Sequence, residues 1–267
     1  MNRVIKLTAV FSAFCLLAGI ATAGFEPGRE DAKQVAPGPE PTCDFSWTGF
    51  YIGARLGGGF GNTELGANGE PVGRFTIRPD NQDLDPGGFI GGGQLGFNWQ
   101  FARFFVLGAE TDFLGSTVSG NTTDAHSVPQ LFPFVSDVPL HARQDINWFG
   151  TVRGRVGFAP WCKWLVYGTG GFAFADVDDS VEFDLRPSGG NSTYPASHSG
   201  TQTGWTAGGG IEFAISQHWT IKAEYLYIDV GDRTAVGNPI PANPPFQVRY
   251  NWDAQFHTFT AGVNFKF

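Results

Sequence analysis

The sequence predicts an all-β fold, an eight-stranded antiparallel transmembrane β-barrel with four long external loops and three short periplasmic turns. Eight segments alternate apolar residues with small or polar ones, and each is long enough for a tilted strand that crosses a bilayer in about 9 to 11 residues. The connections between these segments alternate between short and long. Beyond residue 23, no apolar run reaches the roughly 18 residues of a membrane helix, which leaves strands as the means of crossing.

The first residues carry the features of a secretory signal peptide. Arg3 and Lys6 precede the apolar run LTAVFSAFCLLAGIA, and residues 21–23 supply the small side chains of a cleavage site. Cys15 in the apolar run raises the alternative of a lipoprotein signal. Phe14 opposes it, because this bulky residue stands where such a signal needs a small one.

The chain therefore divides into three predicted parts. Residues 1–23 form the signal peptide, residues 24–46 a Pro-rich, charged periplasmic tail, and residues 47–267 the barrel. Signal removal takes two of the 17 basic residues. The remaining 15 basic and 25 acidic residues give a net charge of about −10. Nucleic-acid binding needs a basic surface, so we expect no nucleic-acid partner.

Each predicted strand has one apolar face and one face of small or polar residues. In WFGTVRGRVGF, for example, Val152 and Val156 share one face, whereas Arg153 and Arg155 share the other. The eight segments are residues 47–60, 89–100, 104–114, 148–158, 164–175, 203–215, 219–230 and 256–267. The turns FAR, PWCK and SQH are short, and the long loops are expected near 61–88, 115–144, 176–202 and 231–255. This rhythm places both ends of the barrel on the periplasmic side.

Alternation alone leaves open which face is inside, because a soluble lipocalin-type barrel would have an apolar interior and a polar exterior. The polar face here is rich in Gly, Thr, Asn and Gln, whereas a soluble exterior would carry many Lys and Glu. Tryptophans also gather near strand ends, as in the aromatic girdles at lipid interfaces. They are Trp47, Trp99, Trp148, Trp164, Trp205, Trp219 and Trp252. We therefore expect the apolar face to meet lipid.

Several stretches resemble a known family. They are WTGFYIGARLGGGFG, TVRGRVGFA, YGTGGFAFADV, TGWTAGGGIEFAISQHWTIKAEYLYIDVG and HTFTAGVNFKF. Over residues 47–267 the chain is similar to the small outer-membrane β-barrel proteins of alphaproteobacteria, often called porin-family or OmpA-like barrels. The resemblance implies an eight-stranded barrel in the outer membrane, and Phe267 resembles the C-terminal aromatic residue read by the barrel-assembly machinery. It implies no single function, since members are described as structural surface proteins, adhesins, haem binders or small pores.

With the apolar face toward lipid, ionisable residues point into the lumen. An eight-stranded barrel is just wide enough for side chains to fill, and unpaired buried charges cost several kcal/mol each. Glu110 and Asp112 lie on the strand next to that of Arg153 and Arg155, which predicts pairing between them. The sequence thus predicts a salt-bridge network that plugs the lumen, with an ion-selective pore as the alternative. The predicted network is Arg55, Glu110, Asp112, Arg153, Arg155, Glu212, Lys222, Glu224 and Lys266.

Three other kinds of site have weaker support. A lipid hydrolase could use His257 at the lipid-facing rim, but no serine stands on a neighbouring outward position. Haem could be bound by loop histidines and a divalent cation by loop aspartates, but neither set has ligand spacing. The loop histidines are His126, His141 and His198, and the loop aspartates are Asp80, Asp83 and Asp85. We expect no enzymatic activity, no cofactor and no metal.

Two cysteines outlast signal removal, Cys43 before the first strand and Cys162 in a short turn. Both would lie at the periplasmic mouth in an oxidising compartment, so we favour a disulfide over two unpaired thiols. Closing this loop of about 120 residues would contribute roughly 4 to 5 kcal/mol in the chain-entropy treatment.

The predicted function is a structural and envelope-integrity role at the surface of the bacterial outer membrane. A narrow diffusion channel, or an adhesin or haem binder that acts through its loops, are the alternatives. The expected partners are outer-membrane lipids, lipopolysaccharide and the barrel-assembly machinery through Phe267. The sequence does not define what the loops bind, and it leaves the oligomeric state open.

Overall fold

The computed structural model describes residues 45–70, 82–101, 103–126, 138–185, 192–240 and 247–267. All of them belong to one compact unit that extends to Phe267. Among these residues, no helix is long and apolar enough to span a membrane.

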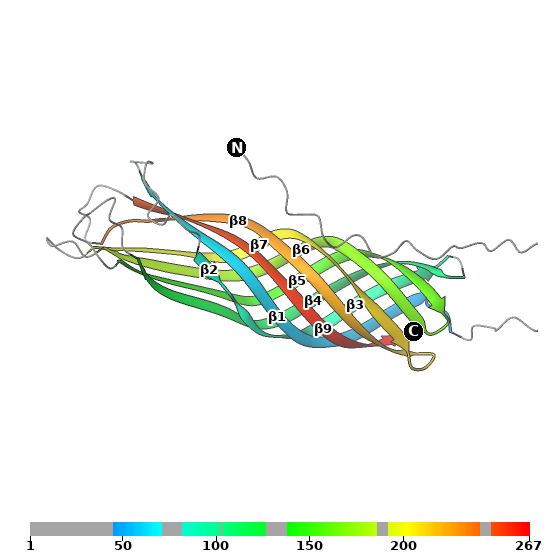
Figure 1. Cartoon of the computed structure of the whole chain (residues 1–267). Coiled ribbons are helices and arrows are strands. Elements are labelled where there is room, and N and C mark those ends of the chain that lie inside the picture. Colours follow the sequence, from blue (N-terminus) through cyan, green and yellow to red (C-terminus); the bar gives the residue numbers. More distant parts are fainter. Residues whose placement is uncertain (1–44, 71–81, 102, 127–137, 186–191, 241–246) are drawn as a thin grey trace, which may run out of the picture. The chain divides into compact units, whose positions relative to one another are not determined.

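The described residues form one antiparallel sheet of eight long strands and one three-residue strand (Figure 1). The strands are β1 (Gly49–Glu70), β2 (Gln82–Leu84), β3 (Gly87–Gln100), β4 (Phe105–His126), β5 (Val138–Trp161), β6 (Trp164–Leu185), β7 (Ser192–Ala214), β8 (Trp219–Gly237) and β9 (Gln247–Lys266). Each long strand pairs with the next long strand along the chain. The short β2 pairs only with β1, from Thr63↔Leu84 to Leu65↔Gln82.

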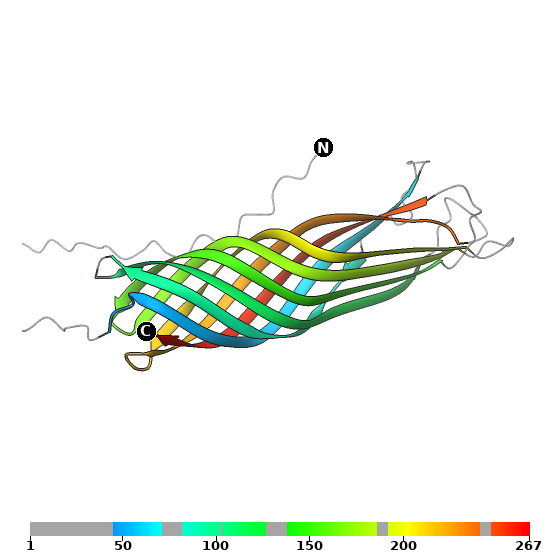
Figure 2. The ribbon, with the colours of Figure 1, turned by 180° about the vertical axis from the view of Figure 1, so that it is seen from behind.

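Pairing between β1 and β9 closes the sheet into a barrel. Their register runs without interruption from Tyr51↔Lys266 to Glu70↔Gln247. Closure satisfies the backbone groups that an open sheet would leave unpaired in the hydrocarbon. The strands are tilted on both sides of the barrel, and the C-terminus lies at the end with the short turns (Figures 1 and 2). The predicted fold class, an eight-stranded antiparallel barrel, is confirmed.

The lower part of the wall, next to the short turns, exposes apolar side chains outward. Phe50 is 62%, Val152 53% and Phe172 76% exposed, whereas Arg153 on the opposite face is 2% exposed. Side chains of this kind in contact with water would be costly, but they suit the lipid of an outer membrane. The inside and outside faces of these segments are therefore those that the alternation predicts.

The predicted boundaries of the strands were wrong at the end away from the short turns. Seven of the long strands span 19 to 24 residues. The expected loop 115–144 is mostly strand, because β4 continues to His126 and β5 starts at Val138. Likewise β6 continues to Leu185 and β9 starts at Gln247. We call these strand extensions, residues 61–70, 116–126, 138–147, 175–185, 192–204, 230–237 and 247–256, the outer tier.

The outer tier reverses the polarity of the membrane-spanning part, with apolar residues inside and polar residues outside. Apolar side chains form a buried cluster inside the outer tier, where Tyr250 and Trp252 from β9 are each at most 1% exposed. The outward-facing side chains at this level are polar, so burial of apolar side chains inside stabilises the strands. The cluster comprises Leu65, Leu84, Leu140, Ala142, Val181, Tyr194, Val248, Tyr250 and Trp252. Trp252, predicted to lie in an aromatic girdle, is instead in this interior.

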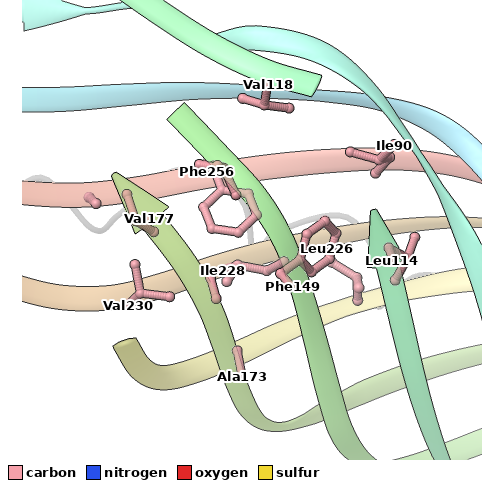
Figure 3. Packing of buried hydrophobic residues seen from close by; sticks show 13 residues of the cluster. Ile90, Leu114, Val118, Phe149, Ala173, Val177, Leu226, Ile228, Val230 and Phe256 are labelled. Carbon is pink, nitrogen blue, oxygen red and sulfur yellow. The ribbon is translucent and has the colours of Figure 1, made fainter. Parts of the chain in front are cut away.

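A second apolar cluster fills the lumen directly above the charged residues, at the level where the membrane-spanning part meets the outer tier (Figure 3). At its centre the ring of Phe149 meets that of Phe256 edge to face, with 5.4 Å between centroids. Leu114, Leu226 and Ile228 surround them and are fully buried. We call this set the middle cluster; its other members are Ile90, Val118, Ile146, Ala173, Ala175, Val177, Val230 and Ala254.

The periplasmic mouth has an apolar floor formed in part by the chain that precedes β1. Phe45 and Trp47 are 5% and 1% exposed and pack edge to face, 4.9 Å apart. The backbone N–H of Trp47 donates to Oε1 of Gln100 over 3.0 Å. The prediction that Trp47 belongs to an interfacial girdle was therefore wrong, because the segment turns inward and its ring covers the lumen. The other floor residues are Val106, Ala159, Leu165, Tyr167 and Ala214.

Register shifts lie near the boundary between the membrane-spanning part and the outer tier. They fall between Gly115 and Val118 in β4, between Ile146 and Trp148 in β5, and between Asp229 and Asp232 in β8. In β5 the shift changes the parity, so that even-numbered residues point inward before it and odd-numbered residues after it. Phe149 consequently points into the lumen.

Because β5 is paired on both sides at Arg143, trypsin should not cleave the folded barrel after this residue. Arg143 is paired with Asn121 of β4 and Ser180 of β6, and a protease needs a locally extended, unpaired chain. Mass spectrometry of limited digests of refolded protein would detect cleavage. Rapid release of a fragment that ends at Arg143 would contradict the strand extension, and the urea-unfolded chain, which should be cut there, is the control.

Candidate functional site

The candidate site is a layer of ionisable side chains inside the barrel, between the floor and the middle cluster. Eight residues from β1, β4, β5, β7 and β8 contribute to it, and each is at most 4% exposed. They are four cations and four anions: Arg55, Arg153, Arg155 and Lys222 with Glu110, Asp112, Glu212 and Glu224. We call these eight residues the charged layer. Its formal charge is zero.

Arg153 of β5 holds three carboxylates together. Its Nη2 donates to Oε1 of Glu110 over 2.6 Å and to Oδ2 of Asp112 over 2.8 Å, both on the neighbouring β4. The same nitrogen lies 3.1 Å from Oε1 of Glu224, which belongs to β8 across the lumen. Thr151 adds a hydroxyl donor to Asp112 over 2.7 Å. The guanidinium thus joins strands that are not adjacent in the wall.

Two further cations complete contacts across the lumen. Nζ of Lys222 donates to both carboxylate oxygens of Glu110, over 2.8 and 2.9 Å. Arg55 donates to Glu224 through Nη1, and its Nη2 lies 3.3 Å from Oδ2 of Asp112. Charge-assisted hydrogen bonds of this kind are about twice as strong as neutral ones. The carboxylates are therefore shared among several cations rather than held in separate pairs.

Arg155 forms the lower edge of the charged layer. Its Nη2 donates to Oε2 of Glu212 over 2.9 Å, and Nη1 donates to the hydroxyl of Tyr51 over 2.9 Å. Its guanidinium carbon lies 3.8 Å from the centroid of the Tyr167 ring, a cation–π contact. Glu212 also accepts from Thr220 over 2.5 Å and from Asn264 over 2.9 Å.

Two tyrosines that sequence reasoning did not assign to the site complete it. Tyr51 donates to Oε2 of Glu110 over 2.6 Å, and Tyr167 donates to Oε2 of Glu224 over 2.8 Å. Each ring needs a glycine opposite it. A Cβ on Gly96 would come within 2.2 Å of the Tyr51 hydroxyl, and one on Gly210 within 2.6 Å of the Tyr167 hydroxyl. Inward-facing glycines on neighbouring strands are the sequence signal that could have revealed these partners.

Lys266, the ninth residue of the predicted network, lies apart from the charged layer. Its Nζ is 5.2 Å from the centroid of the Phe45 ring at the periplasmic floor. A second buried ion pair instead lies in the outer tier, where Arg233 donates to Asp179 through Nη1. Gln144 also donates to Asp179, over 2.9 Å. Sequence reasoning missed this pair because both charged residues fell in expected loops.

The other candidate residues are dispersed. The ring of His257 stacks on Phe60 with centroids 5.3 Å apart, and its Nδ1 lies 2.7 Å from the Tyr225 hydroxyl. His198 lies 2.9 Å from the Gln202 amide. His141 and Asp85 are exposed on the surface. Within the described ranges, no three His, Cys, Asp or Glu side chains gather as metal ligands would. Asp80 lies outside the described residues, as do the side chains of His126 and Asp83.

Of the predicted periplasmic features, the structure describes only part. Cys162 is disulfide-bonded, and Cys43 lies outside the described residues, so their pairing stays a prediction. Phe267 is 71% exposed at the end of β9, and its backbone N–H donates to the carbonyl oxygen of Phe50 over 3.0 Å. The predicted signal peptide, residues 1–23, and the predicted tail up to residue 44 lie outside the described residues.

Comparison with known proteins agrees with this architecture. The model of the outer membrane protein β-barrel domain family matches residues 37–267. The chain belongs to this family. As a family member with a lipid-facing apolar band, it is a protein of the bacterial outer membrane, as predicted.

Named relatives come from alphaproteobacteria. The 31 kDa outer-membrane immunogenic protein of Brucella melitensis is 37% identical over 241 residues, which cover 88% of this chain and 90% of the relative. The 22 kDa outer membrane protein of Rhizobium leguminosarum bv. viciae is 30% identical and covers 69% of this chain and 64% of its own length. Among solved structures, the outer membrane protein OprG of Pseudomonas aeruginosa is 13% identical, covers 84% of this chain and 99% of its own, and has a TM-score of 0.45.

Replacing Arg153 by Met should destabilise this family member by about 3 to 5 kcal/mol, because it leaves Glu110 and Asp112 with less compensation in a buried site. Arg143→Met is the matched control. This side chain is 66% exposed and pairs with the partly exposed Asp145, so its loss should cost less than about 1 kcal/mol. Urea unfolding of the barrel in lipid vesicles, followed by tryptophan fluorescence, measures both. Equal effects of the two substitutions would contradict the role assigned to the charged layer.

Mass mapping under non-reducing conditions should find a crosslinked peptide that contains Cys43 and Cys162. The bonded state of Cys162 and the single other cysteine left after signal removal lead to this expectation. Reduction should separate the two peptides, which serves as the control. Recovery of Cys43 as a free thiol in oxidised protein would exclude the bond.

Proposed function

We propose that the protein is a closed, non-conducting structural barrel that supports the integrity of the outer membrane and carries the outer tier at the cell surface. The observation that carries this proposal is a stack of side-chain layers in the lumen of the described part of the barrel. From the periplasmic side, the floor, the charged layer, the middle cluster, the Arg233–Asp179 pair and the apolar cluster of the outer tier follow one another.

The charged layer supports closure because its cations and carboxylates contact one another across the lumen. The side chains of Arg55, Asp112 and Arg153 are 0% exposed. A passing ion would have to separate these pairs, and each separated charge in a low-dielectric interior costs several kcal/mol. In a diffusion pore, by contrast, lumen charges face a continuous water-filled path.

The apolar layers support the same proposal independently. Phe149 and Phe256 block the middle of the lumen, and Tyr250 and Trp252 block the outer tier. An ion that crossed the charged layer would still have to pass these apolar side chains. Dewetted apolar constrictions are themselves barriers to ions.

A structural role also agrees with the energetics of the wall. Pairing of β1 with both β3 and β9 closes the membrane-spanning part of the wall. The charged layer ties β1, β4, β5, β7 and β8 together across the lumen. The proposed partners are the lipids and lipopolysaccharide around the barrel and, through Phe267, the assembly machinery. No enzymatic activity and no cofactor form part of the proposal.

Refolded wild-type protein should give no discrete conductance steps in planar lipid bilayers, and liposomes that contain it should not swell in sugar solutions. The reason is that the lumen offers no continuous polar path past the middle cluster. Only the folded, heat-modifiable fraction should be measured, with protein-free bilayers as the blank and a general porin as the positive control. Reproducible open levels from the folded fraction would overturn the proposal in favour of a narrow channel.

A further inference from the structure

The outer wall of the outer tier is polar and lies directly above the lipid-facing band. At the boundary, the ring of Trp148 stacks on Phe113 with centroids 5.2 Å apart and meets Phe174 edge to face at 6.2 Å. Immediately above these rings, Asn147 donates to Asp178 over 2.7 Å and lies 3.3 Å from Asp176. The wall therefore changes from aromatic to hydrogen-bonding side chains within about one residue.

A groove of about 570 Å³ is hollowed into this polar wall across β4, β5, β6 and β7. This volume falls in the usual range for small-ligand sites, roughly 300 to 1,000 Å³. The exposed side chains around it point outward from the barrel, so the groove opens sideways rather than toward the lumen or the strand tips. Its polar lining includes Asn121, His141, Arg143, Ser180, Glu182 and Ser197, all exposed.

The groove offers both donors and acceptors at short range. The residues Arg143 and Ser180 are paired across β5 and β6, and Ser180 is in turn paired with Ser197 of β7, which places guanidinium and hydroxyl groups in one row. The next row contains His141, Glu182 and Pro195. Donors, acceptors and a small apolar surface in one shallow groove suit a ligand that is rich in hydroxyl groups.

Arg143 is held ready for such a ligand. Its Nε donates to Asp145 over 2.6 Å and its Nη2 over 3.2 Å, so the carboxylate fixes the guanidinium and raises the pKa of Arg143. The side chain nevertheless stays 66% exposed. Below it, hydrogen bonds from Ser199 and Asn147 lower the pKa of Asp178, which keeps this carboxylate charged as an acceptor. The wall around the groove is thus a fixed polar surface.

The height of the groove indicates what fills it. Arg143 precedes Trp148 by five residues, about 16 Å along the strand and roughly 12 Å along the axis of a barrel whose strands tilt by the usual 35–45°. A lateral opening at this height, just outside the acyl chains, faces the headgroups and sugars of the same leaflet. A ligand from another cell or from solution would first meet the strand tips.

We propose that this groove binds the saccharide portion of lipopolysaccharide in the protein's own outer leaflet. Sugar hydroxyls would be bound by Arg143, Ser180 and Glu182, while the aromatic residues around Trp148 contact the acyl chains below. This inference rests on the proposed contact between the barrel and lipopolysaccharide, and because the site lies on the outer wall it does not depend on whether the lumen conducts.

The test uses the full barrel in nanodiscs and lipopolysaccharide of two lengths, with the core saccharide and as lipid A alone. We expect the saccharide-bearing form to bind at least tenfold more tightly than lipid A, as measured by competition in native mass spectrometry. Ser180→Trp fills the groove and should remove most of this difference. Saturation-transfer NMR with lipid-free core oligosaccharide should show contact to the wild type and not to the variant.

Thr234→Trp is the matched control, because Thr234 is an exposed, outward-facing residue of the outer tier on β8, away from the groove. It should bind within twofold of wild type, and heat-modifiable migration in gels should show that both variants fold. Equal binding of lipid A and the saccharide-bearing form would overturn the proposal. So would wild-type binding by Ser180→Trp, or tighter binding of unrelated soluble polysaccharides than of the core oligosaccharide. The conductance measurements test only whether the lumen is closed, and their outcome is independent of the outcome of these binding experiments.

Discussion

The charged layer must neutralise itself, because an eight-stranded barrel leaves no room for bulk water beside its buried ions. Four cations and four anions meet this condition, and sharing of carboxylates across the lumen distributes each charge over several partners. The requirement extends to neighbouring positions. The glycines Gly96 and Gly210 make room for the tyrosine hydroxyls that complete the layer, and apolar residues above and below exclude water from it. The packing in the lumen and the glycines in the wall thus both follow from the requirement that the buried charges be neutralised.

This constraint also explains why the interior is built in layers. Buried ion pairs contribute little net stability compared with apolar packing, but removal of one partner is costly. The apolar clusters above and below supply stabilisation by burial, whereas the charged layer restricts which strands can lie opposite one another. Arg55 on β1 and Glu224 on β8 are separated in the wall by β9, so their contact depends on the closed barrel. We infer that the apolar layers stabilise the lumen and that the charged layer defines its arrangement.

The sequence predicted the membrane-spanning part well because lipid outside and a narrow lumen inside impose opposite chemistry on alternate residues. The side on which Arg153 and Glu110 lie follows from parity alone. The sequence could not predict contacts across the lumen, such as that of Arg55 with Glu224. Strand order shows which strands are neighbours in the wall but not which side chains meet across the lumen. Lys266 was included because parity places it inward, but its position at the strand end takes it to the floor. Strand extensions such as residues 138–147 were missed because polarity reverses above the lipid and a register shift interrupts the alternation.

Those register shifts have a consequence for how such a protein can change over time. In β4, β5 and β8 they lie just beyond the last lipid-facing aromatic residues, Phe113, Trp148 and Tyr227. A one-residue insertion or deletion above such a shift can be absorbed there, without rotating the lipid-facing residues below it toward the lumen. The segment exposed to the surroundings and the segment held in the bilayer can therefore accumulate changes in length separately. Surface variation under selection by the environment then need not disturb the buried ion pairs.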